Sequence, residues 1–255
     1  MVAIYRTRFK KEIVAEFLPP FGKKESNRVI ILCDGMPGMP RKQDLSYWLS
    51  KKGYWIIYPR FRGCWESDGR FLAKSPAIDI RDIIDELPKG LKELTFGKKF
   101  NLKPEEIFVI GGSFGGAAAV LSTLDPRVTK AIANCPVVDW NVLAHSEKKE
   151  TSNPSYTAYL REAFGQAYRL RRKDWAKLGK GGFYNPISHA DKIDSNKVML
   201  FHAKDDPYVS WRSVENFAEK TGVRLVLLNK GGHLSTNRIV PRYWKTIESF
   251  LRRVN

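Results

Sequence analysis

A serine between two glycines, at the end of an apolar run, is the residue of this sequence best suited to chemistry. Ser113 has the spacing Gly-x-Ser-x-Gly with Gly111 and Gly115. Residues 107–110 predict a buried strand, and the small residues after Gly115 suit a helix packed closely against a sheet. A serine on such a turn exposes a nucleophilic hydroxyl, and backbone N–H groups at the helix start can stabilise negative charge. Because this spacing is common, its meaning depends on an acid and a histidine elsewhere in the chain.

An acid and a histidine do follow, each in a loop after a later apolar run. Asp205 and Asp206 come after residues 198–201, and His233 comes after residues 223–228. Because the carboxyl ends of parallel strands converge at one edge of a sheet, these groups can meet a distant serine there. The histidine would take the serine proton and the carboxylate would orient the histidine. The residues by themselves leave both aspartates open as the acid.

The elements that must position these groups are predicted from hydrophobic periodicity. Alternating runs at 3–9 and 12–18 predict a hairpin at a sheet edge. Strands alternating with helices predict an α/β fold, with a mostly parallel sheet covered by helices on both faces. The further predicted strands are 28–33, 54–58, 107–110, 128–134, 198–201 and 223–228, and the helices are 45–52, one starting at 76, one after 115, 211–220 and 239–254.

The chain resembles the α/β-hydrolases over nearly its whole length. Its second half is similar to stand-alone relatives of the prolyl-oligopeptidase catalytic domain and to related acyl esterases. Residues 185–193 resemble the segment that such proteins carry before the strand of the catalytic acid. The loop that begins at His202 resembles their pattern H-G-x-x-D-x-x-V-P, with Ala203 in place of the glycine and Ser210 in place of the proline.

The resemblance implies a catalytic triad. On that pattern the acid falls on Asp206, and Asp205 is the competing assignment. The implied triad is therefore Ser113 as nucleophile, His233 as general base and acid, and Asp206 as the group that orients His233. The α/β-hydrolase fold with a helical lid insertion is the expected fold class.

The oxyanion hole is expected to use two backbone N–H groups. One belongs to Phe114, directly after the nucleophile, and the other comes from the loop after Cys33. In the family, the residue after a His-Gly pair supplies the second group, which corresponds to Met36 here. Asp34 stands where the family has that histidine. Because the contribution is a backbone N–H, the replacement need not abolish the hole.

Residues 140–186 interrupt the alternation of strands and helices. They are polar, aromatic and basic, and we interpret them as a helical lid or cap inserted into a core formed by residues 1–139 and 187–255. A lid would cover the strand ends, exclude water and set substrate size. The alternative is a solvated helical face with no gating role.

The composition limits which broad classes of protein this chain can belong to. The 255 residues are 43% hydrophobic, and one large domain is the simplest organisation. No apolar run is long enough to span a membrane, and the first ten residues lack the apolar segment of a secretory signal. Cys33, Cys64 and Cys135 lie far apart, which predicts reduced thiols and a cytoplasmic protein.

The net charge of +17 suggests that the protein could bind nucleic acid. However, the positive residues are scattered along the chain and form no known nucleic-acid-binding motif, so we do not expect nucleic acid as a partner.

The sequence therefore predicts a serine hydrolase that cleaves carboxylic esters of small or medium acyl size through an acyl-enzyme. Neither a cofactor nor a metal site is expected, and the substrate is a small-molecule ester or a short acyl or peptide compound. A peptidase or acyl-peptide hydrolase of the oligopeptidase type is the nearest alternative. A basic binding protein that has the fold without turnover is the alternative from another class. The oligomeric state is not predicted.

Overall fold

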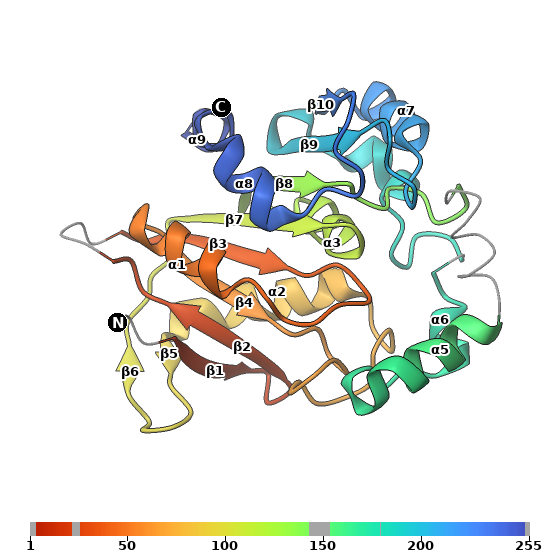
Figure 1. Cartoon of the computed structure of the whole chain (residues 1–255). Helices are drawn as coiled ribbons and strands as arrows, with labels where there is room; N and C mark the ends of the chain where they lie inside the picture. Colours follow the sequence, from red (N-terminus) through yellow and green to blue (C-terminus); the bar gives the residue numbers. More distant parts are fainter. Residues whose placement is uncertain (1–3, 22–25, 143–153, 179, 253–255) are drawn as a thin grey trace.

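The computed structural model describes residues 4–21, 26–142, 154–178 and 180–252, with the backbone alone for 154–157 (Figure 1). Eight strands form one sheet in the order β1-β2-β4-β3-β7-β8-β9-β10. They are β1 (Tyr5–Phe9), β2 (Ile13–Leu18), β3 (Arg28–Cys33), β4 (Trp55–Pro59), β7 (Glu106–Gly112), β8 (Val128–Asn134), β9 (Val198–Ala203) and β10 (Arg224–Leu228). The longer helices are α1 (Gln43–Lys51), α2 (Pro76–Glu86), α3 (Phe114–Ser122), α5 (Pro154–Phe164), α7 (Trp211–Thr221), α8 (Thr236–Arg242) and α9 (Trp244–Arg252).

The sheet is antiparallel only at the end that carries the N-terminal hairpin. β1 pairs antiparallel with β2, and β2 pairs antiparallel with β4. The remaining strands, from β4 through β10, pair in parallel. The predicted edge hairpin and mostly parallel sheet are thus confirmed.

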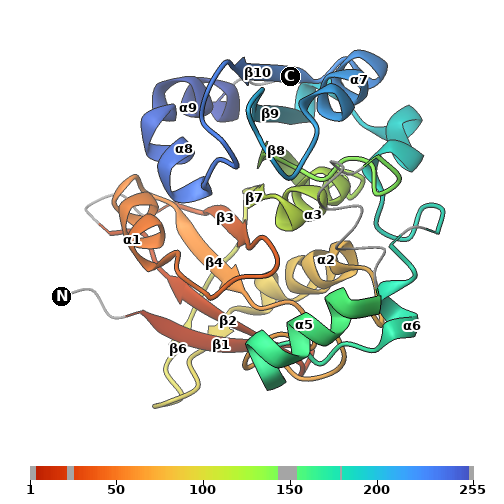
Figure 2. The ribbon, with the colours of Figure 1, turned by 45° about the vertical axis from the view of Figure 1, so that its right-hand side comes forward.

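Helices cover both faces of the sheet, and the strands between them carry apolar side chains on both faces. Within β3, Val29 and Ile31 face one apolar core, whereas Ile30 and Leu32 face the other. Successive side chains of a strand point to opposite faces, so a strand buried on both sides is apolar throughout. The first core packs under α2, α3 and α7, and the second under α1, α8 and α9 (Figure 2).

The predicted helix 239–254 is wrong in one respect, because two helices occupy this part of the chain. α8 ends at Arg242, α9 begins at Trp244, and Tyr243 between them leaves the helical conformation. Pro241 lies within the last turn of α8, where its ring removes a backbone donor and disfavours continuation of the helix. Val240 and Trp244, on either side of Tyr243, are both buried in the second core. Residues 253–255 lie outside the described part of the chain.

A short hairpin was not predicted from the sequence. β5 (Leu91–Lys92) and β6 (Lys99–Phe100) pair antiparallel apart from the main sheet. Strands of this length carry too few residues for a period to be recognised. Phe100 packs its ring against Tyr5 and Phe17, which joins the hairpin to the edge of the main sheet.

The parallel strands end at a single edge, and the candidate site residues lie in the loops there. Ser113 follows β7, Asp206 follows β9 and His233 follows β10. The helical segment that includes α5 and α6 (Arg172–Trp175) lies at the same end of the molecule (Figure 1). Within the described ranges, no helix is long and apolar enough to cross a bilayer.

Candidate active site

Ser113 occupies a strained turn between β7 and α3. Its φ of 53° and ψ of −119° are rare for a residue with a side chain. A Cβ atom on Gly111 would come within 2.1 Å of the Gly115 carbonyl oxygen, and one on Gly115 within 2.4 Å of the Asp34 carbonyl oxygen. The spacing Gly-x-Ser-x-Gly is therefore required by how closely the strand, the helix and the loop after β3 approach one another. This geometry is that of a nucleophile elbow.

His233 is paired with Asp206. The Nδ1 atom of His233 lies 2.8 Å from Oδ2 of Asp206, whose side chain is fully buried. The second oxygen of Asp206 accepts hydrogen bonds from the backbone N–H groups of Tyr208 and Val209 at 2.9 and 3.1 Å. Asp205 instead accepts a bond from the backbone N–H of Gly232 at 2.8 Å. Between the two candidate acids, Asp206 is thus the one that contacts the imidazole ring.

The surroundings of Asp206 favour its ionised form. Burial by itself raises the pKa of a carboxyl group, but the hydrogen bond and the charge of His233 act in the opposite direction, together with the N–H groups of Val209 and Tyr208. The net result is a pKa of Asp206 below its ordinary value. An ionised Asp206 accepts the proton on Nδ1 of His233, which leaves Nε2 of the neutral ring free to act as a base.

Asn134, at the end of β8, joins the nucleophile turn to the histidine loop. Its backbone oxygen accepts the N–H of Ser113 at 2.9 Å, and its side-chain amide donates to the Leu234 oxygen at 2.6 Å. The amide oxygen in turn accepts the hydroxyl of Thr236 at 2.7 Å. The backbone and the side chain of one buried residue thus link Ser113 to the residue that follows His233.

The Ser113 hydroxyl and His233 lie at the same edge without a direct hydrogen bond in the described structure. Catalytic hydrogen bonds are often long in structures without substrate and shorten in the complex. The Tyr208 ring packs edge-on against the His233 ring, with centroids 5.3 Å apart, which limits how far the imidazole can turn. The structure therefore brings Asp206 and His233 into contact, and Asn134 bonds both Ser113 and Leu234, the residue after His233.

The loop after β3 runs close past Ser113. A Cβ atom on Gly35 would lie 3.3 Å from Cβ of Ser113 and 3.9 Å from its hydroxyl oxygen. Met36 is the next residue, and Phe114 is the first residue of α3. The N–H of a first helical residue has no acceptor within its own helix. The two residues that we expect to supply the oxyanion hole thus flank Ser113 in space.

A small cavity of about 20 Å³ opens beside these groups. Its aromatic wall is bonded to the loop after β3 at Gly38, whose carbonyl accepts the indole N–H of Trp65 at 3.2 Å and the hydroxyl of Tyr168 at 3.1 Å. The Gly38 N–H lies 3.0 Å from the same Tyr168 oxygen. The lining also includes Gly35, Met36, Phe61, Phe71 and Phe114.

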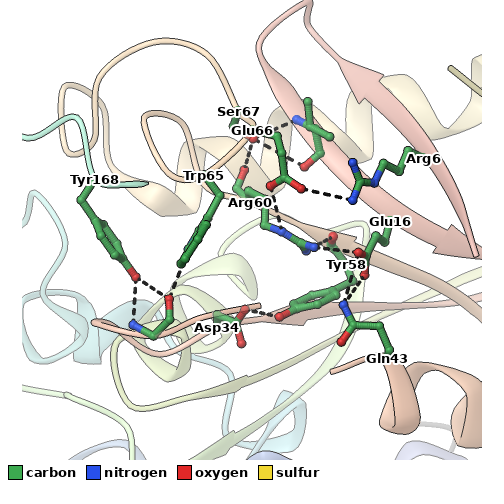
Figure 3. Close-up of polar contacts among 12 residues, drawn as sticks. Arg6, Glu16, Asp34, Gln43, Tyr58, Arg60, Trp65, Glu66, Ser67 and Tyr168 are labelled. Atoms are coloured by element: carbon green, nitrogen blue, oxygen red, sulfur yellow. Dashed lines mark hydrogen bonds and ion pairs between the residues drawn. The ribbon is translucent and has the colours of Figure 1, made fainter. Parts of the chain in front are cut away.

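A polar network includes Arg60 and Asp34, which line this cavity (Figure 3). Arg60 is almost fully buried, and its guanidinium lies 2.9 Å from Glu16 and 3.5 Å from Glu66. It also donates to the Tyr58 carbonyl and lies over the Tyr58 ring, 4.3 Å from its centroid. The Tyr58 hydroxyl donates to the Asp34 carboxylate. The positive charge of Arg60 is thus balanced by its own acidic partners.

The segment around Tyr168 is bonded to the loop after β4. The N–H of Trp65 donates to Ala167, and the N–H of Phe71 donates to the backbone oxygen of Arg169. The Arg169 guanidinium donates to backbone oxygens of the same loop, including those of Trp65 and Gly69. Of the segment 140–186, residues 143–153 and 179 lie outside the described part of the chain.

Cys135, His202 and Asp206 form a group whose potential metal-ligand atoms lie within 4.8 Å of one another. The oxygens of Asp206 are already engaged with His233 and with backbone N–H groups, and the His202 ring bonds the Val209 oxygen at 3.0 Å. Burial raises the pKa of the Cys135 thiol, so this side chain stays protonated. These donors are committed to positioning the acid, and the group does not fit a metal ligand set.

Sequence reasoning missed two residues that shape this site. Asn134 is a polar residue at the end of a predicted strand, which is a weak signal because many strand ends are polar. Tyr168 lies within the basic segment, where neither spacing nor period distinguishes it from its neighbours. Both residues act through bonds to main-chain groups far away in the sequence, to Leu234 and to Gly38.

Comparisons with solved structures find the same fold. An esterase from Pyrococcus furiosus aligns with a TM-score of 0.67 and 18% identity, covering 99% of this chain and 90% of that chain. The alpha/beta hydrolase GrgF from a Penicillium species aligns with a TM-score of 0.70 and 17% identity, covering 99% and 98%. An acylaminoacyl peptidase from Pyrococcus horikoshii aligns with a TM-score of 0.65 and 19% identity, covering 99% of this chain but 42% of that chain.

A search of curated protein sequences finds no match. The family model described as "Alpha/beta hydrolase family" matches residues 43–240, which include Ser113, Asp206 and His233. With the parallel sheet and the nucleophile-elbow geometry of Ser113, this match leads to one conclusion: the chain belongs to the alpha/beta hydrolase family.

Proposed function

We propose that the protein is a serine hydrolase that cleaves carboxylic esters with small acyl groups. The observation that carries this proposal is the contact of His233 with the buried Asp206, at the edge where Ser113 has the conformation of a nucleophile elbow. Membership of the alpha/beta hydrolase family supports hydrolase activity.

Catalysis would proceed in two half-reactions. The Ser113 oxygen attacks the ester carbonyl carbon, its proton passes to Nε2 of His233, and the carbonyl electrons move onto the oxygen. The N–H groups of Met36 and Phe114 bind that oxyanion. Collapse breaks the bond to the alcohol, which leaves with the proton from His233. Water then attacks the acyl-enzyme with His233 as base, releasing the acid and restoring Ser113.

The small cavity favours an esterase over a peptidase. Its volume of about 20 Å³ leaves space for a group of very few atoms beside the oxyanion loop. Peptide or acyl-peptide cleavage is the second candidate, and it is supported by the structural similarity to an acylaminoacyl peptidase.

Segment 140–186 is proposed as a cap whose second half is a fixed wall of the site. The bonds of Ala167 and Arg169 to the loop after β4, and of Tyr168 to Gly38 in the loop after β3, support this role for the wall. The ends of the segment are also joined, since the indole N–H of Trp140 donates to the Tyr184 oxygen at 2.7 Å.

Labelling with a fluorophosphonate probe, followed by peptide mapping, tests the nucleophile. We expect a single adduct on Ser113, and hydrolysis of p-nitrophenyl acetate that falls about 10⁶-fold in Ser113→Ala. Ser195→Ala, in the short helix η4 (Ser195–Lys197), is the matched control and should keep full activity. A folded protein that is neither labelled nor active on any ester would overturn the proposal and leave a binding role. Aminoacyl anilides, compared with nitrophenyl esters, distinguish peptidase from esterase.

A further inference from the structure

Asp34 presents an electrostatic problem for the proposed site. It lies two residues before Met36, its backbone oxygen approaches Gly115 at the start of α3, and it lines the same small cavity as Met36 and Phe114. A carboxylate near an oxyanion hole opposes the negative charge that develops in the transition state. Such a residue slows the reaction unless its charge is compensated.

Two partners hold the Asp34 carboxylate. The Tyr58 hydroxyl donates to one oxygen, as Figure 3 shows, and Nζ of Lys42 lies 2.7 Å from the other. The side chains of Lys42 and Asp34 are only 12% and 26% exposed, so solvent screens this pair incompletely. Burial and the neighbouring Asp34 charge raise the pKa of Tyr58, so its hydroxyl remains a neutral donor. The hydrogen bond from Tyr58 therefore orients the carboxylate, and among the residues that the structure describes, Lys42 is the cation paired with it.

The position of Lys42 is itself unfavourable without Asp34. Lys42 is the residue that precedes the first turn of α1, and its backbone oxygen accepts the N–H of Ser46 at 2.7 Å. The N-terminal end of a helix carries partial positive charge, which disfavours a cation there. The neighbouring Arg41 has an exposed side chain that lies near the Met39 sulfur instead. Of these two adjacent cations, Lys42 is the one directed at the oxyanion loop.

We infer that Lys42 is a positioning and charge-compensating residue of the hydrolytic site, which neutralises Asp34 so that the N–H groups of Met36 and Phe114 can stabilise an oxyanion. This inference rests on the proposed function. Lys42 acts through Asp34 and does not touch the substrate. Since the unpaired Asp34 charge would act on the transition state more than on a neutral ester, its effect should appear in kcat rather than in KM.

A double-mutant cycle tests the inference. Lys42→Met should lower kcat about thirtyfold, the size expected for one unpaired charge several ångströms from an oxyanion in a partly buried site. Asp34→Asn should lower kcat much less. The double variant Asp34→Asn with Lys42→Met should recover kcat to within about threefold of wild type, because neither charge remains. Arg41→Met, which removes one adjacent positive charge without touching Asp34, is the matched control.

A purely structural role of the ion pair gives a different pattern. If the pair only holds the loop, both single variants and the double variant lose kcat to a similar extent, and this result overturns the inference. So does a Lys42→Met variant with kcat within about threefold of wild type. Lys42→Gln, which keeps a donor at similar reach, replaces Lys42→Met if circular dichroism shows that the latter does not fold.

The rate of Ser113 labelling by the fluorophosphonate is a second readout, since that reaction also places negative charge in the hole. It should follow the same order as kcat across the four proteins of the cycle. A wild-type protein without labelling or ester hydrolysis refutes the proposed function itself. An active wild type whose double variant is not rescued refutes only the role of Lys42.

Discussion

His233 contacts Asp206 and not the adjacent Asp205. The ring nitrogen Nδ1 lies 2.8 Å from the Asp206 carboxylate, whereas Asp205 accepts the N–H of Gly232 in the turn just before the histidine. The two neighbouring aspartates thus hold different parts of the same loop. Asp206 orients the ring, and Asp205 holds the main chain that carries it.

This division predicts unequal effects of the two amide substitutions. Asp206→Asn should lower kcat about 10⁴-fold, because the amide no longer stabilises the imidazolium or selects the tautomer with Nδ1 protonated. Asp205→Asn should lower kcat less than about tenfold, because an amide oxygen can still accept the Gly232 N–H. Steady-state hydrolysis of p-nitrophenyl acetate measures both. An inactive Asp205→Asn beside an active Asp206→Asn would reverse the assignment.

The pH dependence of stability provides an independent test of the Asp206 environment. Burial by itself raises the pKa of Asp206, but the contacts with His233 and with backbone N–H groups bring this pKa below its ordinary value of 3.8. A carboxyl group whose pKa is lowered by folding adds stability that is present above the unfolded-state pKa and is lost as pH falls through the folded-state pKa. The difference in unfolding free energy between wild type and Asp206→Asn should therefore shrink as the pH falls below 3.8.

Urea unfolding of both proteins at several pH values between neutral and strongly acidic measures this difference. Equal m-values for the two proteins would serve as the control for a change in the unfolded state. A difference that grows as pH falls would mean that Asp206 is stabilised in its protonated form, contrary to the sign derived from its contacts.

Asn134 should matter for both stability and turnover. Asn134→Ala removes the bond to the Leu234 oxygen and leaves the Thr236 hydroxyl without its acceptor in a buried place. We expect a loss of about 2 kcal/mol in unfolding free energy and about a tenfold lower kcat, since the His233 loop is no longer held to the end of β8. Asn141→Ala, on an exposed loop, is the control. Unchanged thermal stability in Asn134→Ala would contradict this role.

Tyr168 should limit the length of the acyl chain. Its ring lines the small cavity, and its hydroxyl is bonded to Gly38 of the oxyanion loop. Tyr168→Ala should raise kcat/KM for a hexanoyl ester relative to an acetyl ester by at least about tenfold, because the aromatic wall is removed. Tyr168→Phe keeps the wall and loses only the hydroxyl, so its chain-length preference should match that of wild type. A series of p-nitrophenyl esters measures both, and an unchanged preference in Tyr168→Ala would exclude this wall.

The sequence by itself determined most of the fold. Alternating and continuous apolar runs marked the strands of the sheet, and β3 and β8 have the predicted ends. The local spacing around Ser113 determined the nucleophile turn, because small residues are the only ones that permit strand and helix to approach this closely. The strand pattern and the approach of Gly111 to Gly115 are short-range properties, set by neighbours in the chain, whereas the approach of Gly115 to the Asp34 oxygen is made by the tertiary structure.

Contacts between distant segments were decided only by the tertiary structure. Whether Asp205 or Asp206 meets His233 depends on how two loops pack after the sheet has formed, and a shift of one residue turns a side chain elsewhere. The bonds of Asn134 to Leu234, of Tyr168 to Gly38 and of Lys42 to Asp34 likewise join segments that carry no shared pattern. Periodicity reports which face a residue takes, but a single hydrogen bond or ion pair leaves no period in the sequence. For that reason the strained turn at Ser113 could be predicted from the chain alone, whereas the contacts made by Asn134, Tyr168 and Lys42 could not.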